Sequence, residues 1–376
     1  MYLTALGAEG FRNLETFRLE PGRRFNVIEG RNGQGKTSFL EAVYLLAAFR
    51  SPRDARTSEM IRFGAERARI HGEIVRRDVA RTVTVELRPK GKQVTLDGKV
   101  VTSLPSSFAH LNAVVFGPDD LELTKSGPAS RRRFLDRAIY AVWPEHLVAL
   151  KSYKTALESR NKLLKEARLS RRAPDQSVLE VFEHELARHG ARIIQRRHLF
   201  LEGFRPLFEA AFGAITDGEL VGTIGHDASA VDDPAAPPDR LAEAFAARLA
   251  TQRDSDARLG YTKSGPHADD LDFRIGGRPA RIYASQGQHR AFVLALKIAE
   301  LERIRAALGV YPVFLLDDVS SELDEARNRL LMETLDKGGG QVFITTTDRR
   351  WIRVAGAPRL WRVEAGRISH DPGASE

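Results

Sequence analysis

Two hydrophobic periods alternate in the first third of the chain. The stretch "RFNVIEG", which ends at Gly30, is a short apolar run and predicts a strand. Apolar residues then recur at helical spacing, at Phe39, Leu40, Val43 and Leu46. Residues 70–104 read as extended segments with turn signals at Pro89–Gly91 and Asp97–Gly98. The pattern therefore predicts a strand, a glycine-rich loop, a helix and then an antiparallel β-sheet.

From about Pro128 the pattern becomes helical. "KSYKTALESRNKLLKEARLS" and the seven-residue rhythm that follows it, from Leu179 to Phe200, predict two long paired helices joined by a loop at "RRAPDQS". His189, in the seam, is expected to be a packed core residue. The Pro-rich and Ala-rich segment Asp227–Arg240 predicts a surface loop.

Composition narrows the class of protein. The 376 residues are 42% hydrophobic, which is enough for a globular core. The absence of cysteine excludes disulfides, thiolate metal sites and cysteine nucleophiles. No apolar run is long enough to cross a bilayer, and "MYLTALGAEGFRN" lacks the pattern of a secretion signal, so we predict a cytoplasmic protein without a membrane partner.

The charge of the chain is unevenly distributed. It has 58 Lys and Arg against 50 Asp and Glu, a net +8, and residues 126–212 hold 17 basic against 10 acidic residues, a net +7. A basic helical region favours a polyanionic partner such as DNA. The alternative is an ordinary solvated helical surface.

The stretch "GRNGQGKTS" has the spacing of a phosphate-binding loop, between a predicted strand and a predicted helix. Its backbone N–H groups and the helix N-terminus would surround phosphates, Lys36 would contact the outer phosphates, and Thr37 would ligate Mg²⁺. The alternative is a simple glycine turn. The predicted nucleotide-binding residues are Gly30, Arg31, Asn32, Gly33, Gln34, Gly35, Lys36, Thr37 and Ser38.

The stretch "VFLLDDVSSELD" predicts a buried parallel strand that delivers two carboxylates at its C-terminal end, where ligands bind in such sheets. Asp317 is expected to hold Mg²⁺, and Asp318 is expected to orient and deprotonate the attacking water. Asp318 and Lys36 are the predicted catalytic residues. On its own the motif also fits an ordinary strand end with a capping aspartate.

A serine-glycine signature, Ser285, Gln286, Gly287 and Gln288, precedes a long apolar helix from Ala291 to Leu308. Ser285 is a residue type that favours the N-cap position of a helix. In the simpler interpretation it caps the helix and has no other role. The order of phosphate loop, large insertion, signature and acidic strand is that of ATP-binding cassette heads. In that class the signature caps ATP held by a second subunit, so ATP joins two copies and hydrolysis releases them. Ser321 and Asp324 would lie at the same interface.

The segment "FITTTD" places Thr347 where cassette enzymes usually carry a histidine. For Thr345–Thr347, a β-rich strand end without a catalytic role is an equal alternative.

Together these motifs resemble the RecF family, which is related to the heads of SMC-type ATPases. The resemblance covers nearly the whole chain and rests on "FRNL", "GRNGQGKTSFLEAVYLLA", "VVFGPDDLEL", "RRRFLDR", "GPHADDL", "SQGQHR" and "LLDDVSSELD". It implies an α/β fold, an ABC/SMC-like ATPase head with a mixed β-sheet core and an inserted α-helical lobe. The expected ATPase lobe is discontinuous, residues 1–125 and 255–376, and the basic helical lobe is residues 126–254.

The resemblance also implies a function in recombinational repair and replication restart. Such a protein binds ATP and Mg²⁺, dimerises on ATP, hydrolyses it slowly as a weak DNA-dependent ATPase, and binds duplex DNA and single-strand to duplex junctions at gaps. RecO and RecR are the implied partners, in loading RecA and in SOS induction.

Two positions depart from expected patterns. Ala268, in "GPHADDL", stands where the family usually has a basic residue, which puts in doubt any contact from that position. Asp318 is an aspartate where most cassette ATPases have glutamate, although aspartate is usual in RecF. The shorter carboxylate suggests a switch more than a motor.

Candidates for contacts to DNA phosphates are Arg131, Arg132, Arg133, Lys151 and Lys154. An equal alternative for the "RRRFLDR" segment is a structural role in which it pairs with acidic neighbours.

Two other functions also fit a phosphate loop. A transporter ATPase would need a docking surface for membrane partners, and a small-molecule kinase would not need the signature.

Overall fold

The computed structural model describes residues 1–376 with the exception of 102–109, 319–322, 355 and 372–376. The chain forms two compact units, unit 1 (Met1–Glu122 and Leu296–Glu376) and unit 2 (Leu123–Ala295). None of the helices in the described part of the chain is both long and apolar enough to cross a membrane.

Unit 1 contains an antiparallel sheet with the strand order β2-β1-β4-β5-β6-β7. Alternate residues of β4 and β5 are buried, as expected for a sheet with one face on a core. The prediction of an antiparallel sheet over residues 70–104 is therefore confirmed as far as residue 100, and residues 102–104 lie outside the described part of the chain. The strands are β1 (Tyr2–Glu9), β2 (Phe17–Leu19), β4 (Ala68–Arg76), β5 (Val79–Arg88), β6 (Gly91–Leu96) and β7 (Lys99–Val100).

The second sheet of unit 1 has the order β15-β14-β3-β13-β12-β8. Its strands β14, β3, β13, β12 and β8 run parallel, and β15 is antiparallel to β14, so the sheet is mixed as predicted. Every residue of β12 and β13 is buried, because both faces of a parallel sheet are covered. The strands are β3 (Phe25–Glu29), β8 (Ala113–Phe116), β12 (Val313–Asp317), β13 (Val342–Thr346), β14 (Arg359–Glu364) and β15 (Arg367–His370).

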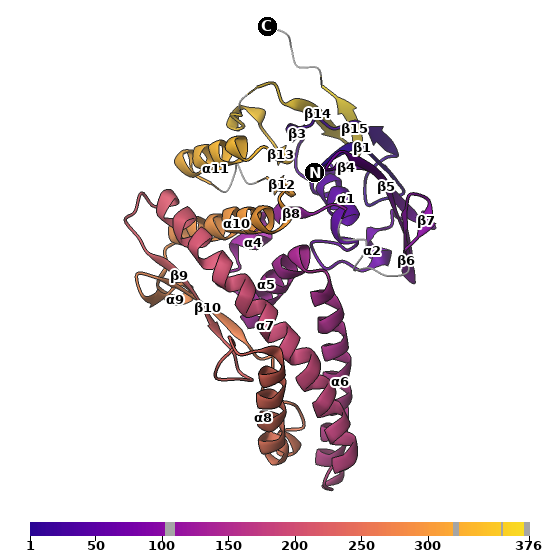
Figure 1. Ribbon diagram of the computed structural model, residues 1–376. Helices are drawn as coiled ribbons and strands as arrows, with labels where there is room; N and C mark the ends of the chain where they lie inside the picture. The colour runs from indigo at the N-terminus through magenta and orange to yellow at the C-terminus, as the bar shows by residue number, and fades with distance from the viewer. Residues whose placement is uncertain (102–109, 319–322, 355, 372–376) are drawn as a thin grey trace. The chain divides into compact units, whose positions relative to one another are not determined.

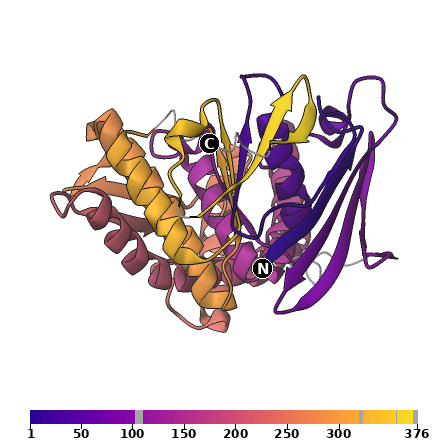
Figure 2. The ribbon, with the colours of Figure 1, turned by 90° about the horizontal axis from the view of Figure 1, so that it is seen from above.

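Helix α1 (Lys36–Ala48) packs between the two sheets of unit 1. It contacts β4 and β5 on one side and β12 and β13 on the other, and Figure 2 shows it beside the indigo and purple strands. Its residues are buried from Phe39 to Ala48. Other helices in the described part of unit 1 are α2 (Thr57–Met60), α4 (Pro118–Leu121), α11 (Glu325–Gly338), the short η2 (Arg349–Trp351) and the part of α10 (Gln286–Leu308) that begins at Leu296.

Unit 2 is dominated by helices. Helices α6 (Glu145–Ser170) and α7 (Gln176–Ile215) run side by side, and α8 (Pro238–Leu259) packs on both (Figure 1). The predicted helix pair and its connecting loop are confirmed. Their common core includes Tyr153, Leu186, Ile193 and Phe245. Helix α5 (Pro128–Val142) precedes them.

Unit 2 also holds a three-stranded sheet of β9 (Gly222–Asp227), β10 (Asp270–Ile275) and β11 (Arg278–Pro279), followed by α9 (Ala280–Tyr283) and the start of α10 (Gln286–Leu308). The division between the units falls inside α10, later than the boundary expected at residue 254. The reason is that β10 pairs with β9 and contacts α5, while β9 contacts α7, so these strands belong to the helical unit.

The segment Asp227–Arg240, which the sequence predicts to be a surface loop, is not exposed along its whole length. It does connect β9 to α8, but Ala230 and Val231 within it are buried in the helical core. Pro-rich and Ala-rich composition marks a break in regular structure, and it does not tell which small apolar residues reach the core.

Candidate nucleotide-binding site

The phosphate-loop residues of unit 1 lie where the carboxyl ends of parallel strands meet. Strand β3 leads into the loop Gly30–Gly35, and α1 begins at Lys36. Strand β13 lies between β3 and β12, and β12 ends at Asp317. This edge of a parallel sheet is the usual place for a ligand site.

Two loop glycines are required by their surroundings. A Cβ on Gly30 would lie 2.5 Å from the carbonyl oxygen of Val363. Gly35 has φ +117°, and a Cβ there would lie 2.6 Å from Leu14. At Gly30 the obstacle is a backbone carbonyl, so a side chain is excluded on steric grounds. At Gly35 the positive φ is strained for any residue with a side chain.

Neighbouring segments hold the loop by hydrogen bonds. The Asn13 side-chain amide donates to the carbonyl of Gly33 (3.1 Å), and the Ser38 hydroxyl donates to the Asn13 oxygen (2.9 Å). On the other side the backbone N–H of Gly366 donates to the carbonyl of Gln34 (3.0 Å). The loop is thus fixed before any ligand binds, which lowers the entropic cost of binding.

The predicted metal ligands of unit 1 are brought together. The Thr37 hydroxyl donates to Asp317 Oδ1 at 2.9 Å, although the two residues are 280 positions apart in the chain. Arg53 Nη2 lies 3.5 Å from the other carboxylate oxygen of Asp317. Mg²⁺ prefers oxygen ligands and is usually held by one or two protein groups together with phosphate and water. The two oxygen donors, from Thr37 and Asp317, fit that ion. Among the described residues there is no cluster of three or more His, Cys, Asp or Glu side chains that could bind a metal without phosphate or water ligands.

Lys36 is buried to 6% exposure and donates to the Gly30 carbonyl (2.6 Å) and to Asn32 Oδ1 (3.2 Å). Burial, the largest cause, lowers the pKa of its ammonium group, and the nearby carboxylates of Asp318 and Asp317 oppose that change. A buried cation bonded to neutral oxygens is poorly compensated, so an anionic phosphate beside it would be stabilised.

Asp318 has φ +51°, a left-handed conformation that is uncommon for residues other than glycine and that clusters at functional sites. Thr345 supports it. The backbone N–H of Asp318 donates to Thr345 Oγ1 (2.9 Å), and the same hydroxyl lies 2.9 Å from Asp317 Oδ1. Thr345 therefore positions the carboxylate of Asp317 and the backbone of Asp318. The sequence interpretation singled out Thr347, which is exposed, and left Thr345 between two alternatives; its place on the strand beside β12 was the missing information.

The signature residues of unit 2 form a capped helix start. The Ser285 backbone N–H donates to Gln288 Oε1 (2.8 Å), and the Gln288 N–H donates to Ser285 Oγ (3.2 Å), a reciprocal capping box. Ser285 and Gln286 are exposed. The hydroxyl of Ser285 accepts in this arrangement and keeps its hydrogen for another acceptor. The cap and a phosphate contact are therefore compatible.

The residues expected at a subunit interface are only partly visible. Ser321 lies outside the described residues. Asp324 is the N-cap of α11, and its carboxylate accepts from the Arg327 N–H at 2.9 Å.

The arginine-rich segment of α5 is mostly committed to internal contacts. Arg131 is buried and makes a bidentate ion pair with Asp270 (2.8 and 2.7 Å), and Arg132 donates to the carbonyl of Asp269. These contacts favour the structural alternative for Arg131 and Arg132. Arg133, Lys151 and Lys154 are exposed, as a DNA contact requires.

"RRRFLDR" and "GPHADDL" are joined in unit 2 by a second set of buried charges. Arg197, 2% exposed, pairs with both oxygens of Asp136 (2.9 and 2.8 Å) and with Asp269 (2.9 Å). The sequence interpretation missed Arg197, which had no motif around it. Ala268, the departure within "GPHADDL", is exposed beside this network.

The comparisons with known proteins agree with this geometry. The model of the RecF/RecN/SMC N-terminal domain matches residues 2–368. DNA replication and repair protein RecF of Anaeromyxobacter sp. (strain K) is 42% identical over 375 residues, 98% of this chain and 99% of that one. The RecF protein of Myxococcus xanthus (strain DK1622) is 41% identical over 380 residues, covering 98% and 97%. The chain belongs to the RecF family.

Solved structures support the same family. A structure described as the recombination mediator protein RecF-ATPrS in the RecFOR pathway superposes with a TM-score of 0.90 at 32% identity over 98% of each chain. An Smc head domain from Pyrococcus furiosus has a TM-score of 0.56 at 16% identity, over 98% of this chain and 96% of that one, which shows the shared ATPase-head fold alone. The names of the RecF relatives describe DNA replication and repair, and membership in the RecF family decides against the transporter alternative.

Proposed function

We propose that this chain is an ATP-gated DNA-binding protein of recombinational repair and replication restart. The observation that carries the proposal is the hydrogen bond between the Thr37 hydroxyl and Asp317 beside the buried Lys36, because it unites the phosphate loop and the acidic strand in one oxygen-lined site. A related RecF structure is described with ATP, at 32% identity and a TM-score of 0.87, which supports ATP as the ligand.

In the proposed reaction each side chain has a separate role. Lys36 would bind the outer phosphates, and Thr37 and Asp317 would hold Mg²⁺, which when bound offsets phosphate charge. Asp318, fixed through Thr345, would orient the attacking water and accept its proton. Aspartate in place of a longer glutamate fits slow hydrolysis, as expected of a switch.

ATP would also control association of two copies. The exposed Ser285 hydroxyl and the N-terminus of α10 form a donor group that suits a γ-phosphate held by the partner subunit. Asp324 and Ser321 would lie near the same contact. Hydrolysis removes the shared phosphate and lets the copies separate.

DNA is the proposed polyanionic partner, as duplex and as single-strand to duplex junctions at gaps. Arg133, Lys151 and Lys154 are the remaining exposed candidates, and Lys and Arg near phosphates bind without reading sequence. RecO and RecR as partners in loading RecA, SOS induction and a cytoplasmic location stay predictions from the family resemblance.

The deciding experiment measures molar mass by light scattering with and without ATP and Mg²⁺. Wild type should dimerise with ATP, Lys36→Ala should stay monomeric, and Asp318→Asn should remain a dimer because it binds ATP without cleaving it. Lys99→Ala, an exposed lysine of β7 in the same unit, is the matched control and should behave as wild type. A wild-type protein that stays monomeric at saturating ATP contradicts the proposal.

Ser285→Arg separates the dimer from the pocket. It should keep ATP binding in each subunit and lose both ATP-driven association and hydrolysis. A variant that hydrolyses ATP at the wild-type rate would show that one subunit suffices, as in a small-molecule kinase.

A further inference from the structure

An open cavity lined by arginines lies at one end of the helical unit, and none of its lining residues belongs to a motif of the nucleotide site. The loop between α6 and α7 and the last turns of α6 and α8 line it, and its volume is about 390 Å³. Its lining contains five arginines and one acidic residue, Asp254; the arginines are Arg168, Arg171, Arg172, Arg253 and Arg258. Such an excess of one charge sign around a concavity attracts an anionic group.

The arginines divide into two groups. Arg253 is held by carboxylate oxygens of Glu183 (2.6 to 3.2 Å) and by Glu180 (3.3 Å), and Arg168 donates to the carbonyl of Leu259 (2.9 Å). The side chains of the other three have no hydrogen bond or ion pair among the described residues, and all three are exposed; these are Arg171, Arg172 and Arg258. The cavity therefore has three exposed guanidinium groups whose charge is not offset by a direct contact.

Nearby carboxylates are mostly engaged elsewhere. Asp175 caps α7 by accepting from the N–H groups of Ser177 and Val178, and Glu166 pairs with Lys162. Asp254 is the one acidic lining residue, against five arginines. Like charges this close raise the energy of the empty cavity, and an anion would lower it.

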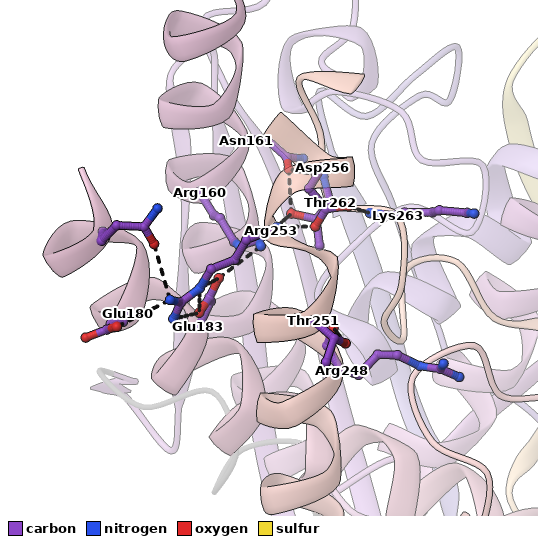
Figure 3. Close-up of polar contacts among 11 residues, drawn as sticks. Arg160, Asn161, Glu180, Glu183, Arg248, Thr251, Arg253, Asp256, Thr262 and Lys263 are labelled. Atoms are coloured by element: carbon purple, nitrogen blue, oxygen red, sulfur yellow. Dashed lines mark hydrogen bonds and ion pairs between the residues drawn. The ribbon is translucent and has the colours of Figure 1, made fainter. Parts of the chain in front are cut away.

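One lining residue, Arg253, is joined to a buried network of ion pairs (Figure 3). Arg160 is fully buried and donates to Asp256 (2.7 Å), Thr262 (2.8 Å) and Glu183 (3.0 Å), and Arg253 donates to the same Glu183. These contacts tie together α6, α7 and α8, the helices that carry most of the lining. The helices around the cavity therefore have a fixed arrangement, which lowers the cost of ordering a ligand.

Exposed apolar residues lie close in sequence to lining residues, outside the lining itself, and indicate the class of ligand. Leu169 follows Arg168 and is 75% exposed, Leu259 follows Arg258, and Tyr261 is 50% exposed. Arginine together with aromatic and apolar groups is typical of protein–protein contacts. A nucleic-acid backbone offers phosphates and gains little from exposed leucines.

We propose that this cavity is a docking site for an acidic segment of a protein partner, with carboxylates bound by Arg171, Arg172 and Arg258 and apolar side chains resting on Leu169 and Tyr261. Guanidinium groups bind carboxylates in bidentate geometry, which gives specificity as well as affinity. The site goes beyond the proposed ATP-gated binding of DNA and needs no nucleotide.

The test uses the full chain without ATP and a fluorescein-labelled peptide that alternates Glu and Leu. Fluorescence anisotropy should show salt-dependent binding to wild type. The triple variant Arg171→Ala/Arg172→Ala/Arg258→Ala should bind about tenfold more weakly or worse, as is typical of arginine hot spots. A peptide with Gln in place of Glu should not bind.

The matched control is Arg192→Ala/Arg240→Ala/Arg274→Ala, which removes the same charge from exposed positions of unit 2 that do not line the cavity. It should keep the wild-type affinity for the peptide. Equal weakening in both triple variants would show a non-specific charge effect and overturn the proposal.

A second arm distinguishes the other class of partner. A short single-stranded DNA without ATP should bind equally to wild type and to the cavity variant. If DNA affinity falls as much as peptide affinity, the cavity is a nucleic-acid site and the proposal is wrong. Circular dichroism melting curves confirm that each variant is folded.

Discussion

Two buried arginines of the helical unit and the buried lysine of the phosphate loop are compensated in opposite ways. In unit 2, Arg160 and Arg197 are almost completely enclosed, and each pairs with two carboxylates. In unit 1, Lys36 is nearly as buried, but the described residues offer it only neutral oxygens as direct partners. Arg160 and Arg197 are thus bonded to carboxylates within unit 2, whereas Lys36 has no direct ion-pair partner among the described residues, unlike the buried Lys297 of unit 1, which pairs with Asp120.

This difference distinguishes side chains that hold the fold together from a side chain that is suited to bind a ligand. A buried ion pair that is fully bonded holds helices in one arrangement, and removing one partner leaves the other charge stranded. A buried cation without an ion pair is unfavourable for the protein alone and is useful when a ligand supplies the opposite charge. The predictions below test this separation.

The largest expected effect is on Arg197. Arg197→Ala leaves Asp136 and Asp269 buried without their cation, so the free energy of unfolding should fall by about 3–5 kcal/mol. Urea denaturation measures it. Arg188→Ala removes an exposed pair with Glu185 on the same helix and should change stability by less than about 0.5 kcal/mol. Similar losses in the two variants would contradict the structural role of Arg197.

A smaller effect is expected for Thr345→Val in unit 1. The change removes the hydroxyl that contacts Asp317 and the Asp318 N–H while keeping the shape of the side chain. ATP hydrolysis should slow by roughly tenfold, about 1.4 kcal/mol, and Thr345→Ser should restore much of it. Steady-state hydrolysis and nucleotide titration separate rate from binding. A rate unchanged by Thr345→Val would remove Thr345 from the site.

The closed network of unit 2 should make the protein less stable in acid. Burial lowers the pKa of His146, and burial likewise lowers the pKa of His267. A histidine with a folded-state pKa below its unfolded value of about 6.5 contributes stability above that value, and the contribution is lost as the pH falls below it.

Asp136 extends this loss to lower pH. Burial alone would raise its pKa, but the charge of Arg197 and the hydrogen bonds from His146 and Arg197 hold the pKa below its usual range. Its contribution is therefore present above about pH 4 and is lost below it.

The contribution of the histidines is measured by urea denaturation from pH 7.5 to 5. The free energy of unfolding should fall over this range, and it should fall less steeply in His146→Gln. A slope equal to that of wild type would exclude His146 as a source.

The smallest effect on stability is expected at the exposed lysines of α6. Lys151→Ala/Lys154→Ala should leave the free energy of unfolding within about 0.5 kcal/mol, because both lysines are exposed and the contact of Lys154 to Glu158 is long, at 3.7 Å. If both touch phosphates, the slope of log affinity for duplex DNA against log salt should decrease by roughly 2. An unchanged slope would place the DNA contacts elsewhere.

The sequence by itself determined the local elements and the chemical types at the site. Glycines and the Lys36–Thr37 pair after a strand specify a phosphate loop, since the spacing fixes the backbone, and four apolar residues before Asp317 specify a buried strand. The antiparallel sheet and the paired helices were equally visible, because periods of two and of about 3.6 are local properties.

Only the tertiary structure decided which charged and polar side chains pair with one another. Arg131 and Lys151 are both basic in the sequence, yet one is enclosed against Asp270 and the other is exposed. Arg197 finds Asp136 and Asp269 across 61 and 72 positions, and Thr345 reaches Asp317 because β13 lies beside β12. Pairing depends on distance in space, and no local pattern encodes the strand order or helix packing that sets that distance.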